Sequence, residues 1–406
     1  MEQRFFSISK NISSEFRRYL YSAFAGNLVV PTYALFVPLL ASRLGASLFE
    51  IGIVGGASNA VYSFLPFIAG HFSDKRDLRG FFIVFSFLIL TIVSISYVLI
   101  SSPIYLIIAR IFEGVGWAIL WPAMDAAVSL DVRPMDSRKA FSIYNVTWSG
   151  AAAIGPLLGA ALIFLTSIQD AFLLTFFIMA TTFILNLIPW LKHRNEKING
   201  PQFLVEKAPT SQVTPEYSSK LRAVFYASAL ALAAVSSGVL FTFFAPYARS
   251  LGISILLVGV ITFVYGFGRF SFYLLSTREH VRHGVLHPEK RARNLLLALA
   301  MASVPGLVIS LKDSSGIIYL IAYAAVGVGT SMVLAIGQAG LISESSPQSN
   351  GRGAGIFESA IGMGACAGPI IGGAISGSSL AVPFIVPPIG FLVFLAAFPL
   401  LTRKSR

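Results

Sequence analysis

The chain has 406 residues, of which 55% are hydrophobic and only 12% are charged. Soluble domains carry about 25% charged residues, so this composition excludes an ordinary soluble globular protein. The formal net charge of +12 is spread over short basic clusters between long apolar stretches, which excludes a nucleic-acid-binding surface as well. Apolar stretches of about 18 residues or more can cross a bilayer as helices, so the sequence predicts an all-α polytopic membrane protein.

Twelve such stretches follow one another along the chain. The predicted spans are residues 19–41, 48–72, 80–101, 103–130, 140–165, 168–191, 221–249, 254–277, 294–311, 316–343, 353–376 and 380–402. A polar stretch with Pro, Gly and Ser separates the sixth span from the seventh, which is the composition of a linker. The sequence therefore predicts one six-helix bundle in residues 1–191, a cytoplasmic linker in 192–220 and a second six-helix bundle in 221–406.

The basic residues predict the orientation of the spans. All but five of the 30 Lys and Arg residues lie in the termini, the linker and the loops on that same side of the membrane. The exceptions are Arg43, Arg249 and Lys312 in loops of the other side, and Arg110 and Arg269 within spans. Because cytoplasmic loops are enriched in Lys and Arg, we expect both termini in the cytoplasm and the protein in the cell membrane.

The two halves of the chain are related in sequence. LGASLFEIG at 44–52 aligns with LGISILLVG at 251–259, a shift of 207 residues. GPLLGA at 155–160 aligns with GPIIGG at 368–373, a shift of 213 residues. Matched halves with spans in parallel order are typical of transporters built from repeats, whose sites lie near the midplane between the halves. We therefore expect two pseudo-symmetric bundles with the functional site between them.

Several segments resemble the major facilitator superfamily, and the resemblance covers essentially the whole chain. GHFSDKRDLRG after the second span is similar to the signature cytoplasmic loop of that family, through Gly70, Asp74, Lys75 and Arg79. Asp77 stands where the family motif has its second glycine. DVRPMDSRKA resembles a further family segment, through Asp131, Pro134 and Arg138.

The resemblance implies a cytoplasmic gate. Its expected members are Gly70, Asp74, Lys75, Arg79, Asp131, Arg138, Arg352 and Glu358. Asp74 is expected to accept hydrogen bonds from a helix N-terminus such as the one near Arg352. Glu358 is placed in the cytoplasmic third of the eleventh span, where it is expected to join two helices.

GAAAIGPLLGA in the fifth span and GACAGPIIGG in the eleventh resemble the family motif Gly-x-x-x-Gly-Pro-x-x-Gly-Gly, which is associated with antiporters. The residues that match are Gly155, Pro156 and Gly159 in the first copy, and Gly364, Gly368, Pro369, Gly372 and Gly373 in the second. Ala151 and Ala160 replace two glycines of the first copy. Small residues let membrane helices approach closely, so we expect both copies at helix contacts.

The fourth span carries the residues ARIFEGVGWAILWPAMD at 109–125. At 100° per residue, Arg110, Glu113, Trp117, Trp121 and Asp125 share one face of a helix. A charge facing lipid at the bilayer centre costs at least about 2.5–3.5 kcal/mol, so this face is expected to line a hydrated cavity. The resemblance places the first, fourth, seventh and tenth spans around such a cavity.

Roles follow for these side chains. Glu113, Arg110 and Asp125 are expected to take part in proton coupling, with Glu113 carrying the proton. Trp117 and Trp121 offer flat apolar or cation-binding faces to a substrate. The alternative for Arg110 and Glu113 is that they neutralise each other and join helices.

Four further residues are candidates for the substrate cavity. They are Gln338, Arg269, Asn27 and Tyr33. Gln338 is the repeat mate of Asp125, and for Arg269 a structural pairing is an equal alternative to a substrate role. The histidines in the loop 278–293 are expected to be solvated, since matching metal ligands are lacking nearby, so no metal and no cofactor are predicted.

These observations predict a secondary active transporter of a small organic solute that works by alternating access. The sequence contains no phosphate-binding Gly-x-x-x-x-Gly-Lys-[Ser/Thr] loop and no His-Glu-x-x-His, so neither ATP-driven transport nor an enzyme is expected. Aromatic faces with carboxylates favour proton-coupled efflux of drug-like or cationic compounds by antiport. Arg110 and Arg269 favour the alternative, proton-coupled import of an organic anion or polar metabolite. A non-transporting receptor is a further alternative, and the expected partners of a monomer are substrate, protons and lipid.

Overall fold

The computed structural model describes residues 13–66, 78–130, 137–199, 220–276, 290–344 and 350–401, together with positions 68, 278, 285 and 287. Its regular elements in those ranges are helices, which confirms the predicted all-α fold. Eleven helices of the described residues are long and apolar enough to cross a bilayer. A further helix, α3 (Leu48–Tyr62), covers the first part of the predicted second span. The protein is therefore a multi-pass membrane protein.

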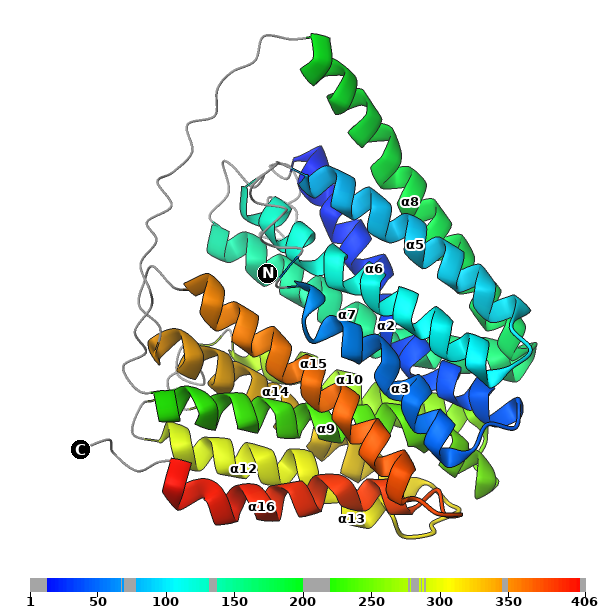
Figure 1. Ribbon diagram of the computed structural model, residues 1–406, viewed down its shortest axis with the longest axis vertical. Helices are drawn as coiled ribbons and strands as arrows, with labels where there is room; N and C mark the ends of the chain where they lie inside the picture. Colours follow the sequence, from blue (N-terminus) through cyan, green and yellow to red (C-terminus); the bar gives the residue numbers. More distant parts are fainter. Residues whose placement is uncertain are drawn as a thin grey trace.

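The helices fall into two groups along the chain. The N-terminal group contains α2 (Ser14–Arg43), α3, α5 (Arg79–Leu99), α6 (Pro103–Leu130), α7 (Ser137–Leu165) and α8 (Ile168–Asn199). The C-terminal group contains α9 (Lys220–Ser250), α10 (Ile255–Ser276), α12 (Arg291–Ser303), α13 (Pro305–Ile309), α14 (Ile317–Glu344), α15 (Asn350–Ile375), the 3₁₀ turn η2 (Val382–Ile385) and α16 (Val386–Leu401). Figure 1 shows the first group in the upper part of the view and the second in the lower part.

Contacts between helices define a bundle in each half and the interface between them. In the N-terminal bundle, α5 packs against α6 and α8, and α2 packs against α7. In the C-terminal bundle, α12 packs against α14, and α9 packs against α15. Across the interface, α3 packs against α15, α7 against α10 and α2 against α9. Two helix pairs, α3–α15 and α7–α10, thus form the long seams between the bundles.

The sequence repeat has a structural counterpart in the turns that follow α2 and α9. Gly45 and Gly252, which are 207 residues apart, have φ angles of 80° and 81°. In both turns a residue just after the helix donates its backbone N–H to a helix carbonyl at 3.0 Å, from Ala46 to Ala41 and from Ile253 to Ala248. A positive φ costs glycine little because it lacks a β-carbon, so both halves build the same turn from a glycine at the same position.

The backbones approach closely in both seams near Gly52 and Gly259. A β-carbon built at Gly52 would lie 2.4 Å from the carbonyl oxygen of Pro369, which places α3 directly on α15. A β-carbon built at Gly259 would lie 2.3 Å from the β-carbon of Ala160, which does the same for α10 on α7. Small residues permit this contact between membrane helices. Both sites lie toward the ends of α3 and α10 that follow the paired turns.

The two glycine-proline motifs lie at equivalent contacts inside the two bundles. A β-carbon at Gly155 would lie 2.1 Å from the carbonyl oxygen of Leu28, and one at Gly368, its repeat equivalent, would lie 2.7 Å from that of Val235; one at Gly364 would lie 2.0 Å from the carbonyl oxygen of Ala231. The first contact joins α7 to α2 and the other two join α15 to α9. Gly159 also faces α2, Gly368 faces α9, Gly372 faces η2, and the carbonyls of Pro156 and Pro369 face α10 and α3.

The structure departs from the predicted spans at two places in the C-terminal half. The predicted span 294–311 is broken, because α12 ends at Ser303 and Pro305 begins the short helix α13. The predicted span 380–402 begins with the turn η2, and α16 starts only at Val386. Proline lacks a backbone N–H and fixes its φ angle, so it favours a helix start over a helix interior at both places.

Candidate substrate cavity between the bundles

A cavity of about 570 Å³ lies between the two bundles. It is lined by residues of α2, α3, α6 and α7 from one half and of α9, α10, α14 and α15 from the other. Its volume is within the range of pockets that hold small organic ligands. The fourth-span residues Arg110, Glu113, Trp117, Trp121 and Asp125 all reach its wall, so the predicted stripe borders this cavity.

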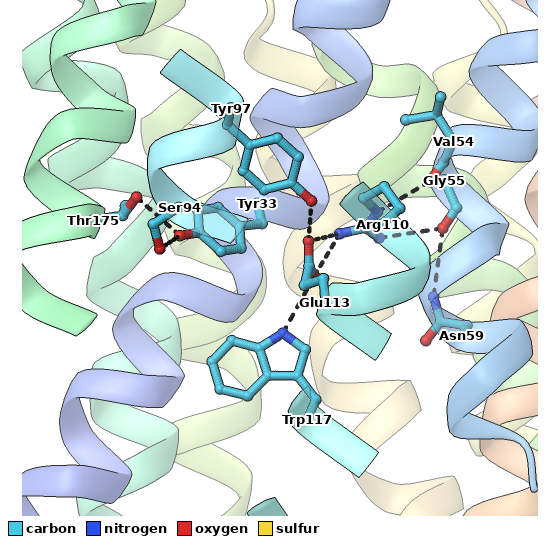
Figure 2. A network of polar contacts seen from close by, with 10 residues as sticks. All are labelled: Tyr33, Val54, Gly55, Asn59, Ser94, Tyr97, Arg110, Glu113, Trp117 and Thr175. Carbon is cyan, nitrogen blue, oxygen red and sulfur yellow. Dashed lines mark hydrogen bonds and ion pairs between the residues drawn. The ribbon is translucent and has the colours of Figure 1, made fainter. Parts of the chain in front are cut away.

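Arg110 and Glu113 form a closed ion pair on α6. Arg110 Nη1 donates to Glu113 Oε1 at 2.6 Å and to Oε2 at 2.7 Å, and the two side chains are only 3% and 2% exposed. Figure 2 shows both side chains enclosed between α6 and its neighbours. The spacing of three residues places the two groups one turn apart on the same helix face. The pair therefore carries no net charge.

Four further hydrogen bonds complete this network. Arg110 Nε donates to the Val54 carbonyl at 3.0 Å, and Nη2 donates to the Gly55 carbonyl at 3.4 Å. The Tyr97 hydroxyl donates to Glu113 Oε2, and Trp117 Nε1 donates to Oε1 at 3.2 Å. Buried charges are stable when they are paired and hydrogen-bonded in this way.

Gly114 brings the carbonyl groups of α3 within reach of Arg110. A β-carbon at Gly114 would lie 2.4 Å from the carbonyl oxygen of Ser58 on α3. The equivalent glycine of the second half, Gly327, would meet the carbonyl of Tyr265 on α10 at 2.2 Å. The same close contact thus recurs in both bundles, but only the first half uses it to hold an arginine.

Tyr33 lies elsewhere than predicted, and its assignment to the cavity is wrong. Its ring is fully buried within the N-terminal bundle and packs edge-on against Tyr97, with ring centroids 5.1 Å apart. Its hydroxyl shares hydrogen bonds with Ser94 of α5 and Thr175 of α8. Residues 27 and 33 are 120° apart on a helix, so the face of α2 that turns Asn27 to the cavity turns Tyr33 into the bundle.

Two stacked indole rings form part of the N-terminal cavity wall. Trp117 and Trp121 have ring centroids 5.6 Å apart and an interplanar angle of 7°. Gly26 of α2 makes room for them, because a β-carbon there would lie 3.1 Å from Trp121. Trp117 is fixed in place by its hydrogen bond to Glu113. The stack offers a rigid apolar face to a ligand.

Two carboxylates from opposite bundles also line the cavity. Asp125 of α6 is exposed to it beside the hydroxyl of Tyr144 on α7. Glu358 of α15 is half-buried and accepts a hydrogen bond from the Tyr62 hydroxyl of α3 at 3.1 Å. Neither carboxylate forms an ion pair within the described part of the chain. Glu358 thus lies on the cavity wall and joins α15 to α3, and its membership of a gate stays a prediction.

Arg269 of α10 lies on the opposite side of the cavity. Its guanidinium carbon lies 5.7 Å from the ring centroid of Trp148 and 5.8 Å from that of Tyr265. Tyr273 is a further neighbour, and Trp148 and Tyr273 are themselves in contact edge-on at 6.0 Å. No carboxylate of the described residues pairs with Arg269. The surroundings of this arginine are therefore aromatic, unlike those of Arg110.

The remaining predicted residues have the following positions. Asn27 lines the cavity and donates to the Ala23 carbonyl at 3.0 Å, and Gln338 lines it from α14. Arg79 is the first residue of α5. Gly70, Asp74, Lys75 and Asp131 lie outside the described residues, and Arg138 and Arg352 lie in α7 and α15 with side chains that are not described. Within the described ranges, no group of three His, Cys, Asp or Glu residues is arranged to hold a metal ion.

Sequence reasoning missed several residues of this site. Tyr97, Tyr144, Trp148 and Tyr273 touch its charged groups from neighbouring helices. Each looks like an ordinary apolar-span aromatic in the sequence. The one available signal was a Tyr or Trp predicted to lie at the same depth in the membrane as a charged residue of another span, because its polar group could reach that charge.

Comparison with known proteins agrees with this architecture. The family model of the Major Facilitator Superfamily matches residues 19–347. One curated relative, "Uncharacterized MFS-type transporter MJ1317" of Methanocaldococcus jannaschii, is 28% identical over 153 residues. That match spans 38% of this chain and 38% of the relative, so well under two thirds of the relative's length is covered.

Solved structures share the fold at low sequence identity. The nucleoside transporter NupG matches with a TM-score of 0.72 and 13% identity, over 97% of this chain and all of that chain. A bacterial homologue of the human lysosomal transporter Spinster, in an inward-facing and occupied conformation, matches with a TM-score of 0.73 and 16% identity, over 97% and 98%. The peptide transporter POT in complex with sulfate matches with a TM-score of 0.71 and 13% identity, over 95% and 94%.

The chain belongs to the major facilitator superfamily. The family model covers most of its length, and the matched structures have the same two-bundle fold.

Proposed function

We propose that the protein is a proton-coupled secondary transporter of a small organic solute, with Asp125 and Glu358 as the proton-carrying groups. The observation that carries the proposal is that these two carboxylates, one from each bundle, line the same cavity without a basic partner among the described residues. Ionisable groups within the membrane that face a hydrated cavity are typical of proton pathways. Proton binding at these carboxylates is then part of the transport cycle.

Alternating access is supported by where the cavity lies. Both seams are tightly packed near Gly52 and Gly259, and close contacts continue farther along them, from Gly266 to Ala153 and from Gly362 to Ser63, beside the cavity-lining residues. With the termini in the cytoplasm, as the positive-inside rule predicts, the end of the seams near Gly52 and Gly259 faces outward and the cavity lies nearer the cytoplasm. The Spinster homologue with the same fold is an inward-facing structure. A cavity between two bundles of this fold is the arrangement that alternating access requires.

Glu113 fits a structural role better than the proton-carrying role that the sequence favoured. Its two oxygens accept hydrogen bonds from Arg110, Tyr97 and Trp117, and only 2% of its surface is exposed. Protonating it would remove the counter-charge of a buried Arg110, which costs several kcal/mol (about 3–5). The ion pair is expected to stay intact through the cycle.

The sign of the substrate charge decides the direction of coupling. Arg110 and Glu113 cancel, so the cavity carries the charges of Arg269, Asp125 and Glu358. Protonation of a carboxylate makes the cavity more positive. A cationic substrate would then compete with protons, as in antiport, whereas an anionic substrate would bind together with them, as in symport. The two motif copies resemble those of antiporters, and Arg269 favours the anion.

The test is solute-driven proton movement in proteoliposomes that contain a pH-sensitive dye. A panel of nucleosides, dipeptides, organic cations and organic acids is added, and the change in internal pH is recorded. At least one solute is expected to move protons through the wild-type protein. Asp125→Asn and Glu358→Gln should each abolish or strongly reduce that proton movement, because the amide side chain cannot take up and release a proton as a carboxylate does.

A matched control removes a carboxylate outside the cavity. Asp170 is an exposed residue in the first turn of α8, and Asp170→Asn should leave solute-driven proton movement unchanged. Proton movement that survives in the Asp125→Asn, Glu358→Gln double variant would contradict the proposal. So would solute flux in the wild-type protein that proceeds with no proton movement in either direction.

A further inference from the structure

Arg269 is a cation on the cavity wall without an anion to balance it among the described residues. Its guanidinium group lies over the rings of Trp148 and Tyr265, and it hydrogen-bonds the side chains of Tyr265 and Tyr273. Aromatic faces attract a cation but do not neutralise it. A charge within the membrane is normally paired or faces water. This residue therefore has its full charge available toward the cavity.

Two buried side-chain atoms of the cavity wall lack a hydrogen-bond partner in the described part of the chain. They are Nε of Arg269 on α10 and Oγ1 of Thr330 on α14. Both can donate a hydrogen bond. Buried polar atoms are nearly always satisfied, so two unsatisfied donors on one cavity wall indicate that an acceptor joins them in another state of the protein.

The structure assigns an anion-binding subsite to Arg269 and Thr330, and we propose on this ground that the transported solute carries a carboxylate or phosphate group. A guanidinium group matches either anion with two parallel N–H donors, and the Arg269 guanidinium carbon lies 5.7 Å from the ring centroid of Trp148. This proposal rests on the function proposed above, transport of a small organic solute, and specifies that this solute is an organic acid.

The position of the subsite connects ligand binding to the movement of the bundles. Arg269 and Thr330 belong to the C-terminal half, whereas Trp148 belongs to α7 of the N-terminal half. An anion held by Arg269 therefore lies at the α7–α10 seam. The repeat mate of Arg269 is Tyr62, which lies at the other seam with Glu358. The cavity thus has a basic seam and an acidic seam, and a solute with one anionic end is oriented between them.

The test compares acids with their neutral amides, which share the same body. Purified protein in detergent is titrated with matched pairs of carboxylic acids and carboxamides and with glycerol phosphate and glycerol, at one fixed pH. Binding is measured from the melting temperature and from intrinsic tryptophan fluorescence, since Trp148 lies beside the subsite. At least one acid or phosphate is expected to bind, and its neutral counterpart should bind at least about tenfold more weakly.

Variants locate the effect at Arg269. Arg269→Gln should weaken binding of the acid about tenfold or more, and Arg269→Lys should retain part of it because the charge remains without the fork. Lys312→Gln removes an exposed positive charge in the loop after α13 and should change nothing. Short-chain phosphatidylglycerol is tested beside the free anions, and tighter binding of the lipid than of every free anion would overturn the assignment to a transported solute.

The measurement that can overturn the proposal uses the wild-type protein, so it does not require any variant to fold. If wild-type protein binds no acid or phosphate more tightly than its neutral counterpart, Arg269 is not an anion subsite. Because these titrations use no proton gradient, they can succeed when the proton-movement test fails, and the reverse also holds. The two proposals are therefore separable.

Discussion

Both arginines within the membrane-spanning helices carry a positive charge away from bulk water, but their surroundings stabilise that charge in different ways. Arg110 is enclosed by Glu113 and two backbone carbonyls, so its charge is cancelled inside the protein. Arg269 stands on aromatic rings at the cavity wall, and no carboxylate of the described residues pairs with it. The difference indicates that the first arginine holds the N-terminal bundle together and that the second is available to a ligand. An intramembrane charge is thus informative only together with its partners.

The largest expected effect separates the two arginines by stability. Arg110→Gln leaves the Glu113 carboxylate buried with only Tyr97 and Trp117, and should lower the free energy of unfolding by about 3–5 kcal/mol. Arg269→Gln removes a charge that no described carboxylate balances, and should cost far less. Melting temperatures in detergent measure both. A larger loss for Arg269→Gln than for Arg110→Gln would reverse the comparison.

A smaller effect comes from the contact that gives Arg110 its carbonyl partners. Gly114→Ala places a methyl group against the Ser58 carbonyl of α3 and should destabilise the protein by about 1–3 kcal/mol. Gly150→Ala on α7 is the control, because a β-carbon there meets nothing within 4 Å. Equal melting temperatures for the two variants would show that the α3–α6 contact is looser than described.

The next effect comes from the single hydrogen bond between Tyr62 and Glu358 at the α3–α15 seam. Tyr62→Phe removes the donor to Glu358 and should change the coupling by about 0.5–1.5 kcal/mol, seen as a shift in the pH profile of solute-driven proton movement. Tyr21→Phe, on an exposed position of α2, should leave the profile in place. A profile that moves equally in both variants would remove Tyr62 from the coupling mechanism.

The smallest effect is expected at the aromatic support of Arg269. Trp148→Phe keeps a ring of smaller area, so the interaction with the guanidinium group weakens by about 0.5–1 kcal/mol. The affinity for an organic acid should fall only a few-fold. Trp190→Phe, on α8 beside Phe81, should not change it. A loss as large as that of Arg269→Gln would mean that Trp148 itself binds the solute.

Much of this architecture follows from the sequence, because it depends on local patterns. Span length, the paired turns at Gly45 and Gly252, and the charged face of α6 each follow from spacing along the chain. The helical period could also have shown that Tyr33 does not line the cavity together with Asn27, since the two residues point in different directions on α2.

The rest depends on contacts between helices that are far apart in the sequence. Tyr62 and Glu358 are 296 residues apart, and Trp148 and Arg269 meet only because α7 packs against α10. The repeat alignment relates equivalent positions of the two halves, but it does not state which of them touch across the seam. Whether a charge is cancelled or available is decided by those contacts.

The central claim is that protons and an anionic solute occupy the same cavity and favour each other. It is tested most directly by the affinity for a binding acid across pH, in wild-type protein and in the Asp125→Asn, Glu358→Gln double variant. The groups facing the two carboxylates in the described structure are Tyr62, Tyr144 and each other. As the pH falls and a carboxylate is neutralised, the wild-type affinity should rise, by about 5- to 150-fold for a coupling of 1–3 kcal/mol, while the double variant should show no such rise. An affinity that is independent of pH in the wild-type protein, or that falls as protons bind, would contradict the account.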